Sequence, residues 1–563
     1  MNKIQLIECV PNFSEGNDMN IIRQITDVIE AVDGVKLLDV DPGKATNRTV
    51  VTFVGEPEPV IEAAFQAIKK ASELIDMNKH SGEHPRMGAT DVCPLVPVSN
   101  ISMEEVVKYA HKLGERAGSE LDIPFYMYES AATKKDRRNL ATVRAGEYEG
   151  LSKKLDQPAW KPDYGSAQFN PRAGATAIGA RDFLVAYNVN LNTTSVRRAN
   201  SVAFDVREKG RIKRKGDPIN GPIINDKKGN PVRTKGACKS VKAIGWFIEE
   251  YGVAQISMNL TNISITPLHE VFEACHKSAT KRGMRVTGSE LVGLVPLKVL
   301  IDAGKHFLKK QNRSLGVSDS EIIKIAVKSL GLDELGNFDP AKKIIEYQLR
   351  DTGYAPLLEM DLRKFADETA SESPAPGGGS ISAYVGALGI SLGTMVANLS
   401  ANKRAWDDKV ALYSDWAVKG QQLKDSLLKL VDEDTKSFNN IIDAIRLPKS
   451  SNTEKHVRTQ AIQDATKYAT EVPLKVMEIT DATFDILKKM AVIGNPNSAS
   501  DAGVGALCAR AAVHGAYLNV KINVSGIDDK KFVTRVMKKA DKLAKLADKK
   551  ESEILKLVNK AIG

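Results

Sequence analysis

HSGEHPRMGATD, residues His80–Asp91, is the stretch around which the rest of this 563-residue sequence is organised. Its twelve residues hold two histidines, two acids, an arginine, two glycines and a proline, a mixture that cannot form a hydrophobic core. Residues 60–75 before it repeat apolar side chains at helical spacing, and residues 92–98 after it are typical of a buried strand. We therefore expect a polar loop held between two rigid elements, which is where catalytic groups are usually mounted.

Two histidines in this loop are candidates for proton transfer. Pro85 favours an extended backbone at His84, so that the imidazole is presented rather than buried against a helical turn. An imidazole titrates near neutral pH and can take up or deliver a proton under cellular conditions. His84 is accordingly a candidate general base or acid, and His80 competes for that role. The alternative is a histidine that only holds a structural loop together.

The composition limits the class of protein. At about 150 residues per domain, the length predicts three or four units. The net charge of +10 is modest, and the 6% of aromatic residues form no stretch interleaved with arginine, so we expect no nucleic-acid partner. The five cysteines are scattered, which fits a reducing compartment and offers no metal-ligand spacing. Because no metal-ligand cluster is visible, we expect no bound metal. The N-terminus lacks the apolar run of a signal peptide, so we expect a cytoplasmic protein.

Strands and helices alternate through the first 349 residues and predict an α/β fold. We expect two mixed-sheet α/β subdomains, residues 1–181 and 182–349. The basic stretch 207–235 is interpreted as a solvated surface loop. The expected strands are 4–10, 35–40, 48–54, 92–98, 124–128, 183–191 and 253–259, and the expected helices are 21–29, 57–75, 103–117, 267–281, 291–308 and 319–330.

Two polar turns stand out in the first subdomain, DVDPGKATNR at 39–48 and PDYGSAQFNPRAGATAIGAR at 162–181. The second is rich in glycine and alanine, so its backbone amides could lie close against a flat ligand or an anion. The alternative is that it is a simple turn, as most glycine-rich loops are.

After a linker at residues 350–356, residues 357–563 predict an all-α helical bundle. Residues 381–401 are apolar and long enough to span a membrane, but they are rich in glycine and serine and poor in large aliphatic residues. We therefore expect a closely packed bundle helix and no membrane span. Gly377–Gly379 precede this helix, where free amides favour an anionic group.

The next long helix carries a second candidate site. One carboxylate falls within an apolar stripe of helical spacing: Leu427, Leu430, Asp434, Phe438, Ile441 and Ile445. A buried aspartate must be paired, hydrogen-bonded or placed at a functional cavity, because an unpaired charge is costly to bury. A polar network within the bundle is the alternative. The break GNPNSASDAG, 494–503, adds Asp501 as a candidate for the same cavity.

Long polar motifs then connect the chain with a known family. They are ECVPNFSEG at Glu8, LLDVD at Leu37, TNRTV at Thr46, TFVG at Thr52, GEHPRMGATDVCPLVPV at Gly82, RAGEYE at Arg144, GATAIGARDFL at Gly174, LVGLVPL at Leu291, APGGGS at Ala375, VDEDTKSF at Val431, RLPK at Arg446 and GAYLNVKIN at Gly515. With these motifs the chain resembles bifunctional formimidoyltransferase-cyclodeaminases over nearly all its length. The basic stretch 207–235 looks longer than is typical of that family.

The resemblance implies a folate enzyme of histidine degradation and one-carbon metabolism, both a transferase and an ammonia lyase. The α/β half would transfer a formimino group from N-formimino-L-glutamate to tetrahydrofolate, giving L-glutamate and 5-formimino-tetrahydrofolate. The helical half would close the product to 5,10-methenyl-tetrahydrofolate and release ammonia. Tetrahydrofolate, with or without a polyglutamate tail, would be a co-substrate rather than a tightly bound cofactor. The family forms homo-oligomers.

The resemblance also assigns residues. His84 matches the catalytic histidine of the transferase and Asp434 the catalytic aspartate of the cyclodeaminase. The folate-binding stretch matches Gly165, Ser166, Ala167, Gln168, Phe169, Asn170, Pro171, Arg172, Ala173 and Gly174.

Arg86 and Arg48 are candidate partners for a substrate carboxylate, or structural ion pairs with Glu83 or Asp39. Formyl transfer, methenyl-tetrahydrofolate cyclohydrolase activity and a non-catalytic folate-binding protein are the competing functions.

Overall fold

The computed structural model describes residues 5–43, 47–82, 85–216, 221–348 and 356–563. The chain divides into two compact units, each of which is described by itself. The first comprises Met1–Val299 and Leu330–Leu349, and the second comprises Leu300–Ser329 and Arg350–Gly563.

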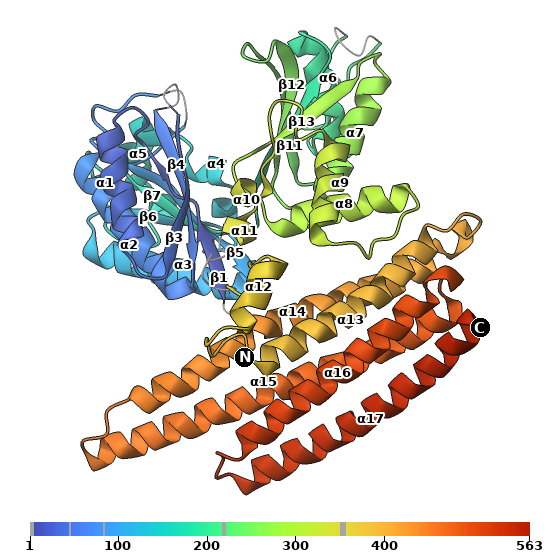
Figure 1. The fold of residues 1–563 in the computed structure, drawn as a ribbon. Coiled ribbons are helices and arrows are strands. Elements are labelled where there is room, and N and C mark those ends of the chain that lie inside the picture. The colour runs from blue at the N-terminus through green and yellow to red at the C-terminus, as the bar shows by residue number, and fades with distance from the viewer. Residues whose placement is uncertain (1–4, 44–46, 83–84, 217–220, 349–355) are drawn as a thin grey trace. The chain divides into compact units, whose positions relative to one another are not determined.

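The first subdomain of unit one is a mixed sheet covered by helices (Figure 1). Its described strands run in the order β1-β4-β2-β5-β7-β6, with β3 beside β4, and only β5, β7 and β6 are parallel. The strands are β1 Leu6–Cys9, β2 Asn12–Phe13, β3 Val35–Gly43, β4 Arg48–Gly55, β5 Thr90–Ser99, β6 Phe125–Glu129 and β7 Thr176–Ala180; the main helices are α1 Met19–Glu30, α2 Pro57–Leu74, α3 Met103–Glu120, α4 Leu140–Val143 and α5 Glu147–Leu155. The apolar faces of α1, α2 and α3 pack into one core with the sheet.

The glycine-rich stretch 162–181 differs from its prediction as a turn, because its last part is strand β7. Every residue of β7, TAIGA, is buried, since β5 and β6 flank it and α3 covers it. A strand made of such small residues lacks the β-branched and aromatic side chains by which strands are recognised in a sequence.

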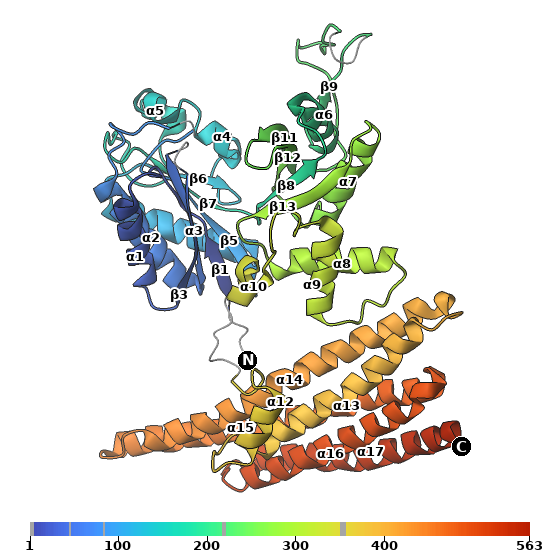
Figure 2. The same cartoon turned by 45° about the horizontal axis from the view of Figure 1, so that its top comes forward.

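The second subdomain is an antiparallel sheet in the order β11-β12-β8-β13. Its elements are β8 Val185–Leu191, α6 Val196–Val206, β11 Val241–Ile248, β12 Val253–Leu260, α7 Leu268–Thr280 and β13 Val286–Val292; α10 Pro340–Lys343 and α11 Ile345–Gln348 also belong to unit one. Leu291 and Val292 end a strand, and the helix expected from residue 291 begins only at Leu297. The basic stretch 207–235 contains a short hairpin, β9 Arg211–Ile212 paired with β10 Arg233–Thr234, in a largely exposed segment (Figure 2).

Unit two is helical. It contains most of α8 Leu297–Lys310, then α9 Asp319–Leu330, α12 Leu362–Thr369, α13 Gly378–Ala401, α14 Val410–Arg446, α15 Asn452–Ile493, α16 Ala499–Val524 and α17 Lys530–Ile562. The loop between α8 and α9 docks on the bundle, because the Gly316 carbonyl accepts hydrogen bonds from Asn398 Nδ2 (2.9 Å) and Gln421 Nε2 (3.1 Å).

Helix α13 lies at the centre of unit two, packed against α14, α15 and α16. Its small residues permit close approach: a Cβ at Gly389 would meet the Gly505 carbonyl at 2.9 Å. By length and composition α13 is the one helix in the described residues that could cross a membrane, and 61% of its most apolar window is buried within the protein.

Candidate active sites

The polar stretch 80–91 is held as predicted, between α2, which ends at Leu74, and β5, which begins at Thr90. Glu83 and His84 lie outside the described residues. The neighbouring Pro85 is described, and it lines a pocket of about 600 Å³.

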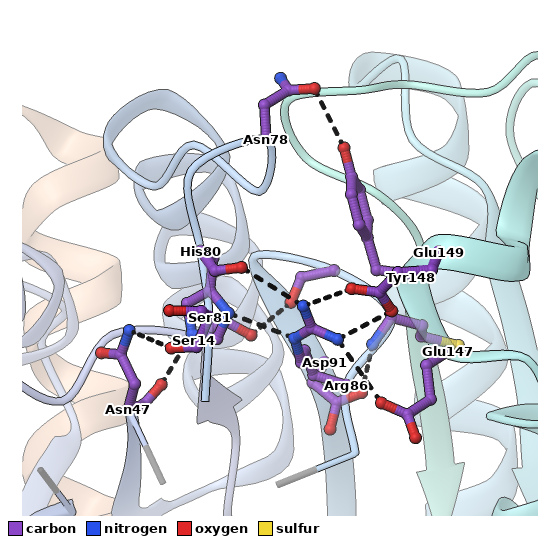
Figure 3. Close-up of polar contacts among 12 residues, drawn as sticks. Ser14, Asn47, Asn78, His80, Ser81, Arg86, Asp91, Glu147, Tyr148 and Glu149 are labelled. Carbon is purple, nitrogen blue, oxygen red and sulfur yellow. Dashed lines mark hydrogen bonds and ion pairs between the residues drawn. The ribbon is translucent and has the colours of Figure 1, made fainter. Parts of the chain in front are cut away.

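Arg86 is a structural ion pair rather than a free substrate ligand. Arg86 is 8% exposed, and its guanidinium donates to both carboxylate oxygens of Glu149, at 2.7 and 2.9 Å, and to Glu147 at 3.5 Å (Figure 3). The carboxylate of Glu149 raises the pKa of Arg86, which therefore stays charged. Of the two alternatives for Arg86, these contacts favour the structural ion pair, with Glu149 and Glu147 rather than Glu83 or Asp39 as the observed partners.

His80 is also held on both sides. Its Nδ1 accepts a hydrogen bond from Arg86 Nε at 3.2 Å, and its Nε2 lies 2.9 Å from the Asn47 carbonyl. Because the arginine only donates and the carbonyl only accepts, the ring is the neutral tautomer with its proton on Nε2. Both nitrogens are engaged within the loop, so His80 serves to hold the loop.

Asp91 anchors the other end of the stretch. Its buried carboxylate accepts from Arg144 Nε at 3.2 Å, from Arg144 Nη2 and from the backbone amide of Met87 at 3.1 Å. Burial raises the pKa of Asp91, and the positive charge of Arg144 opposes that rise. Arg144 was not singled out as a site residue, although it opens the RAGEYE motif.

Arg48 belongs to the same charged cluster. Burial and the positive charge of Arg144 lower the pKa of Arg48, and the negative charges of Asp91 and Asp41 raise it. Asp41, not Asp39, is thus the acid of β3 that acts on Arg48. Burial, then Asp41, raises the pKa of Asp39, and Lys343 is the cation that opposes them. Arg48 remains a candidate for a substrate carboxylate, whereas the expected pair with Asp39 is replaced by Asp41 and Asp91.

The structure brings the stretch 165–174 against the stretch 80–91. The Ala89 amide donates to the Ala173 carbonyl (2.8 Å), and the Ala175 amide to the Met87 carbonyl (2.9 Å). Gly174 is required at this approach, since a Cβ there would lie 2.3 Å from the Met87 carbonyl oxygen. Tyr148 lies between Glu147 and Glu149 in the sequence, and the centroid of its ring is 5.6 Å from the centroid of the Phe169 ring. Three segments distant in sequence therefore form one surface.

The pocket beside Pro85 carries three cations. Its lining residues are Pro85, Tyr128, Glu129, Ser130, Asn139, Leu140, Ala141, Arg144, Ala145, Gly146, Glu147, Arg181, Asp182, Leu184, Ser240, Lys242, Thr261 and Asn262. Arg144, Arg181 and Lys242 supply positive charge suited to carboxylates, beside three acids of the same lining, and Arg144 is already paired with Asp91. One wall, the turn 144–147, is fixed by the buried Lys154, whose ammonium donates to the carbonyls of Val143 (2.6 Å) and Ala145 (3.0 Å).

The second candidate residue, Asp434, belongs to α14, and its side chain lies against the N-terminus of α13. Its Oδ2 accepts from Ser380 Oγ at 3.2 Å, and a Cβ at Gly379 would stand 2.1 Å from its Oδ1. Burial raises the pKa of Asp434, and hydrogen bonds from the Ser380 side chain and backbone oppose the rise. A carboxyl group of the chain itself, that of Asp434, thus lies where an anionic group is predicted, at Gly377–Gly379.

Two expectations around Asp434 are corrected. Leu427 is fully buried, but Phe438 is 43% and Ile445 is 48% exposed, so the stripe leaves the core near Asp434. Asp501 is not near Asp434 within the chain. A Cβ at Gly378 would meet Asn519, and Asp501 precedes Asn519 on the continuous helix α16 by 18 residues, about 27 Å. Asn519 and Ser380 are the neighbours that sequence reasoning missed.

In the described residues, no group of three or more His, Cys, Asp or Glu side chains is arranged to hold a metal ion.

Comparison with known proteins agrees with this two-part arrangement. Residues 6–181 match the formiminotransferase domain, N-terminal subdomain; residues 186–350 match the formiminotransferase domain; and residues 361–542 match the formiminotransferase-cyclodeaminase family. Formimidoyltransferase-cyclodeaminase from Gallus gallus is 42% identical over 560 residues, 99% of each chain.

Relatives of each half also exist as separate proteins. Glutamate formimidoyltransferase from Streptococcus pyogenes serotype M1 is 42% identical over 55% of this chain and 95% of its own. Methenyltetrahydrofolate cyclohydrolase from Methylorubrum extorquens is 36% identical over 32% of this chain and 88% of its own.

The chain has an α/β half and a helical half, each with its own candidate residue for proton transfer. These features and the family matches define a bifunctional folate enzyme. The chain belongs to the formimidoyltransferase-cyclodeaminase family.

Proposed function

We propose that this protein transfers the formimino group of N-formimino-L-glutamate to N5 of tetrahydrofolate, and then closes the product to 5,10-methenyl-tetrahydrofolate with release of ammonia. The similarity to bifunctional relatives over 99% of the chain carries this proposal. Transfer would belong to the α/β half and ring closure to the helical half.

In the transfer step, N5 of tetrahydrofolate attacks the formimino carbon and loses its proton as the tetrahedral intermediate forms. The glutamate nitrogen must gain a proton as its bond to that carbon breaks. We assign both proton transfers to His84. Its neighbour Pro85 lines the 600 Å³ pocket, and Arg144, Arg181 and Lys242 in the same lining suit the carboxylates of the glutamate donor.

In the ring-closing step, N10 of the folate attacks the same carbon and ammonia leaves. The departing nitrogen must be protonated, and we assign this to Asp434. Because burial raises its pKa, the carboxyl group holds a proton to higher pH than an exposed aspartate does, which suits a general acid.

Tetrahydrofolate acts in this proposal as a co-substrate, with or without a polyglutamate tail, and the enzyme works in the cytoplasm as a homo-oligomer. Exposed apolar side chains on α13 and α16, Leu388, Met395, Leu399, Val504 and Leu507, support self-association, which light scattering would measure. The burial of α13 supports a core role for that helix rather than a membrane span.

Two single substitutions test the division of labour. His84→Ala should abolish glutamate release from formiminoglutamate and tetrahydrofolate, while ammonia release from prepared 5-formimino-tetrahydrofolate continues. Asp434→Asn should do the reverse. Loss of both activities in either folded variant, or of neither, would contradict the assignment.

A second candidate activity for the helical half is methenyl-tetrahydrofolate cyclohydrolase, which the similarity to the Methylorubrum extorquens relative favours. Incubation with 5,10-methenyl-tetrahydrofolate separates the two, because a cyclohydrolase opens that ring without any source of ammonia. Comparing N-formylglutamate with N-formiminoglutamate as donor tests formyl transfer in the same way, and turnover of either donor excludes a non-catalytic folate-binding protein.

A further inference from the structure

In the sheet of the second subdomain, strand β11 has one covered face, while its other face is exposed. Helix α6 lies so close to β11 that a Cβ at Gly245 would stand 2.3 Å from the Asn200 amide nitrogen. Side chains alternate along a strand, so Lys242, Ile244 and Trp246 project from the opposite face. Lys242 lines the 600 Å³ pocket, while Ile244 is 56% and Trp246 is 42% exposed. The open face of β11 therefore leads away from the pocket.

Strands β11, β12 and β8 are neighbours in this sheet (Figure 2). A chain of hydrogen bonds across these strands holds the indole of Trp246. Trp246 Nε1 donates to Gln255 Oε1 (3.1 Å), and Gln255 Nε2 donates to Asn190 Oδ1 (2.7 Å). Asn190 Nδ2 then donates to Glu334 Oε2 (2.6 Å).

The direction of this chain is fixed by the indole. An indole N–H can only donate, so Gln255 accepts through Oε1 and donates through Nε2, and this in turn fixes the orientation of the Asn190 amide. Gln255 is 1% exposed and Asn190 is fully buried, so the two amides are protected from competing water. The fold thus orients a large aromatic side chain that is 42% exposed.

A preoriented aromatic ring favours binding, because the entropy of ordering that side chain is lost on folding and not again on binding. Aromatic side chains of this kind stack with flat rings of many chemistries. The distance between Trp246 and the pocket decides which ring of the ligand the indole can contact. Trp246 lies four residues along the strand from the pocket residue Lys242, about 13 Å, so a pterin bound in the pocket does not reach the indole.

We infer that Trp246 is a stacking platform for the p-aminobenzoyl ring of tetrahydrofolate. The inference rests on the proposed function, because it takes the pterin to react beside Pro85 in the pocket. The substrate then extends from Lys242 past Ile244 to the indole, with the aryl ring on Trp246.

Trp246→Leu tests the inference, with Trp246→Phe as the conservative variant and Phe247→Leu as the matched control. Phe247 is the adjacent residue of β11, is 39% exposed and has no place in the hydrogen-bond chain. Trp246→Leu should raise the KM for tetrahydrofolate about tenfold or more, with kcat and the KM for formiminoglutamate within about twofold. Trp246→Phe should recover most of the affinity, and Phe247→Leu should match the unsubstituted enzyme. An unchanged kcat and an unchanged KM for formiminoglutamate report that the α/β half of each variant is folded.

Fragment competition supplies a second measurement. p-Aminobenzoyl-L-glutamate should inhibit transfer by the unsubstituted enzyme and lose that inhibition in Trp246→Leu, whereas a tetrahydropterin fragment should inhibit both equally. An unchanged KM for tetrahydrofolate together with equal inhibition by p-aminobenzoyl-L-glutamate would overturn the inference and leave the proposed function intact. Absence of transfer in the unsubstituted enzyme would instead overturn the proposed function.

Discussion

At the scale of single residues, the neighbours of a charged group decide its role more than its type does. Arg86 looked suited to bind a carboxylate, but two glutamates 61 and 63 positions away occupy its guanidinium. Such pairings are invisible in a sequence, because nothing local indicates which distant acid a folded chain will bring near. Asp434 is the opposite case: burial raises the pKa of its carboxyl, and the hydrogen bonds from Ser380 only partly oppose that rise.

Glu8 provides a residue-scale prediction about pH. Burial, with a smaller contribution from Glu346, raises the pKa of this β1 carboxyl to about 7, and Arg181 opposes the rise. A folded pKa above the unfolded value of 4.5 means that the protonated form is favoured by folding, so this stabilisation is present below pH 4.5 and is lost as the pH rises through 7. Glu8→Gln should therefore raise the free energy of unfolding at pH 8 by about 2–3 kcal/mol and change it little at pH 4.5.

Urea unfolding at the two pH values measures this difference, with the exposed Glu104→Gln as the control. A Glu8→Gln variant no more stable than the unsubstituted protein at pH 8 would contradict the prediction.

At the scale of elements, recognition from sequence depended on strong periodicity. Helices α2 and α3 and strand β5 were predicted closely, because large apolar side chains repeat at the helical spacing or form a continuous buried run. Strand β7 was missed because alanine and glycine carry no strand signal. The candidate site was partly predicted: the two stretches 80–91 and 165–174 were identified, but their contact through Gly88 and Gly174 depends on strand order, which local patterns do not encode.

The start of α13 supports an element-scale prediction. A methyl group at Gly379 would stand 2.1 Å from Asp434 Oδ1, so Gly379→Ala must displace the carboxylate or the first turn of the helix. Ring closure should fall by about 10–100-fold, because small misplacements of a proton donor are costly, while formimino transfer is unchanged.

Gly377→Ala is the matched control, because its nearest neighbour would be the Pro374 carbonyl at 3.7 Å. Ammonia release and glutamate release measured on the same preparation separate the two activities. Equal ring closure by both alanine variants would show that the position of Asp434 is not critical.

At the scale of the whole molecule, the boundaries of compact structure and of sequence families do not coincide. The formiminotransferase family match runs through residue 350, yet residues 300–329 group with the helical unit. The physical reason is the docked loop, in which Gly316 touches α14 so closely that a Cβ would lie 2.2 Å from that of Ala417. The Leu315 amide adds a hydrogen bond to Ser414 Oγ at 2.9 Å.

Gly316→Ala should therefore destabilise unit two by about 1–3 kcal/mol, because the backbone of α14 cannot yield to the added methyl group. Gly336→Ala, which would meet no atom within 4 Å, should have little effect. Thermal unfolding measures stability, and limited proteolysis should cut residues 311–318 faster in the first variant. Identical melting and cleavage of both variants would exclude a stabilising role for the docked loop.

The docking of α8 and α9 on the bundle has a consequence for the evolution of the chain. If a gene were split at the family boundary near residue 350, both products would inherit a severed interface: one would carry a helical hairpin without its support, and the other a bare patch on α14 and α13. A free-standing transferase must resurface the hairpin and a free-standing cyclodeaminase must resurface the patch, or each must cover it with a second subunit. Fusion of two ancestral genes would, in turn, have been made durable by this hairpin.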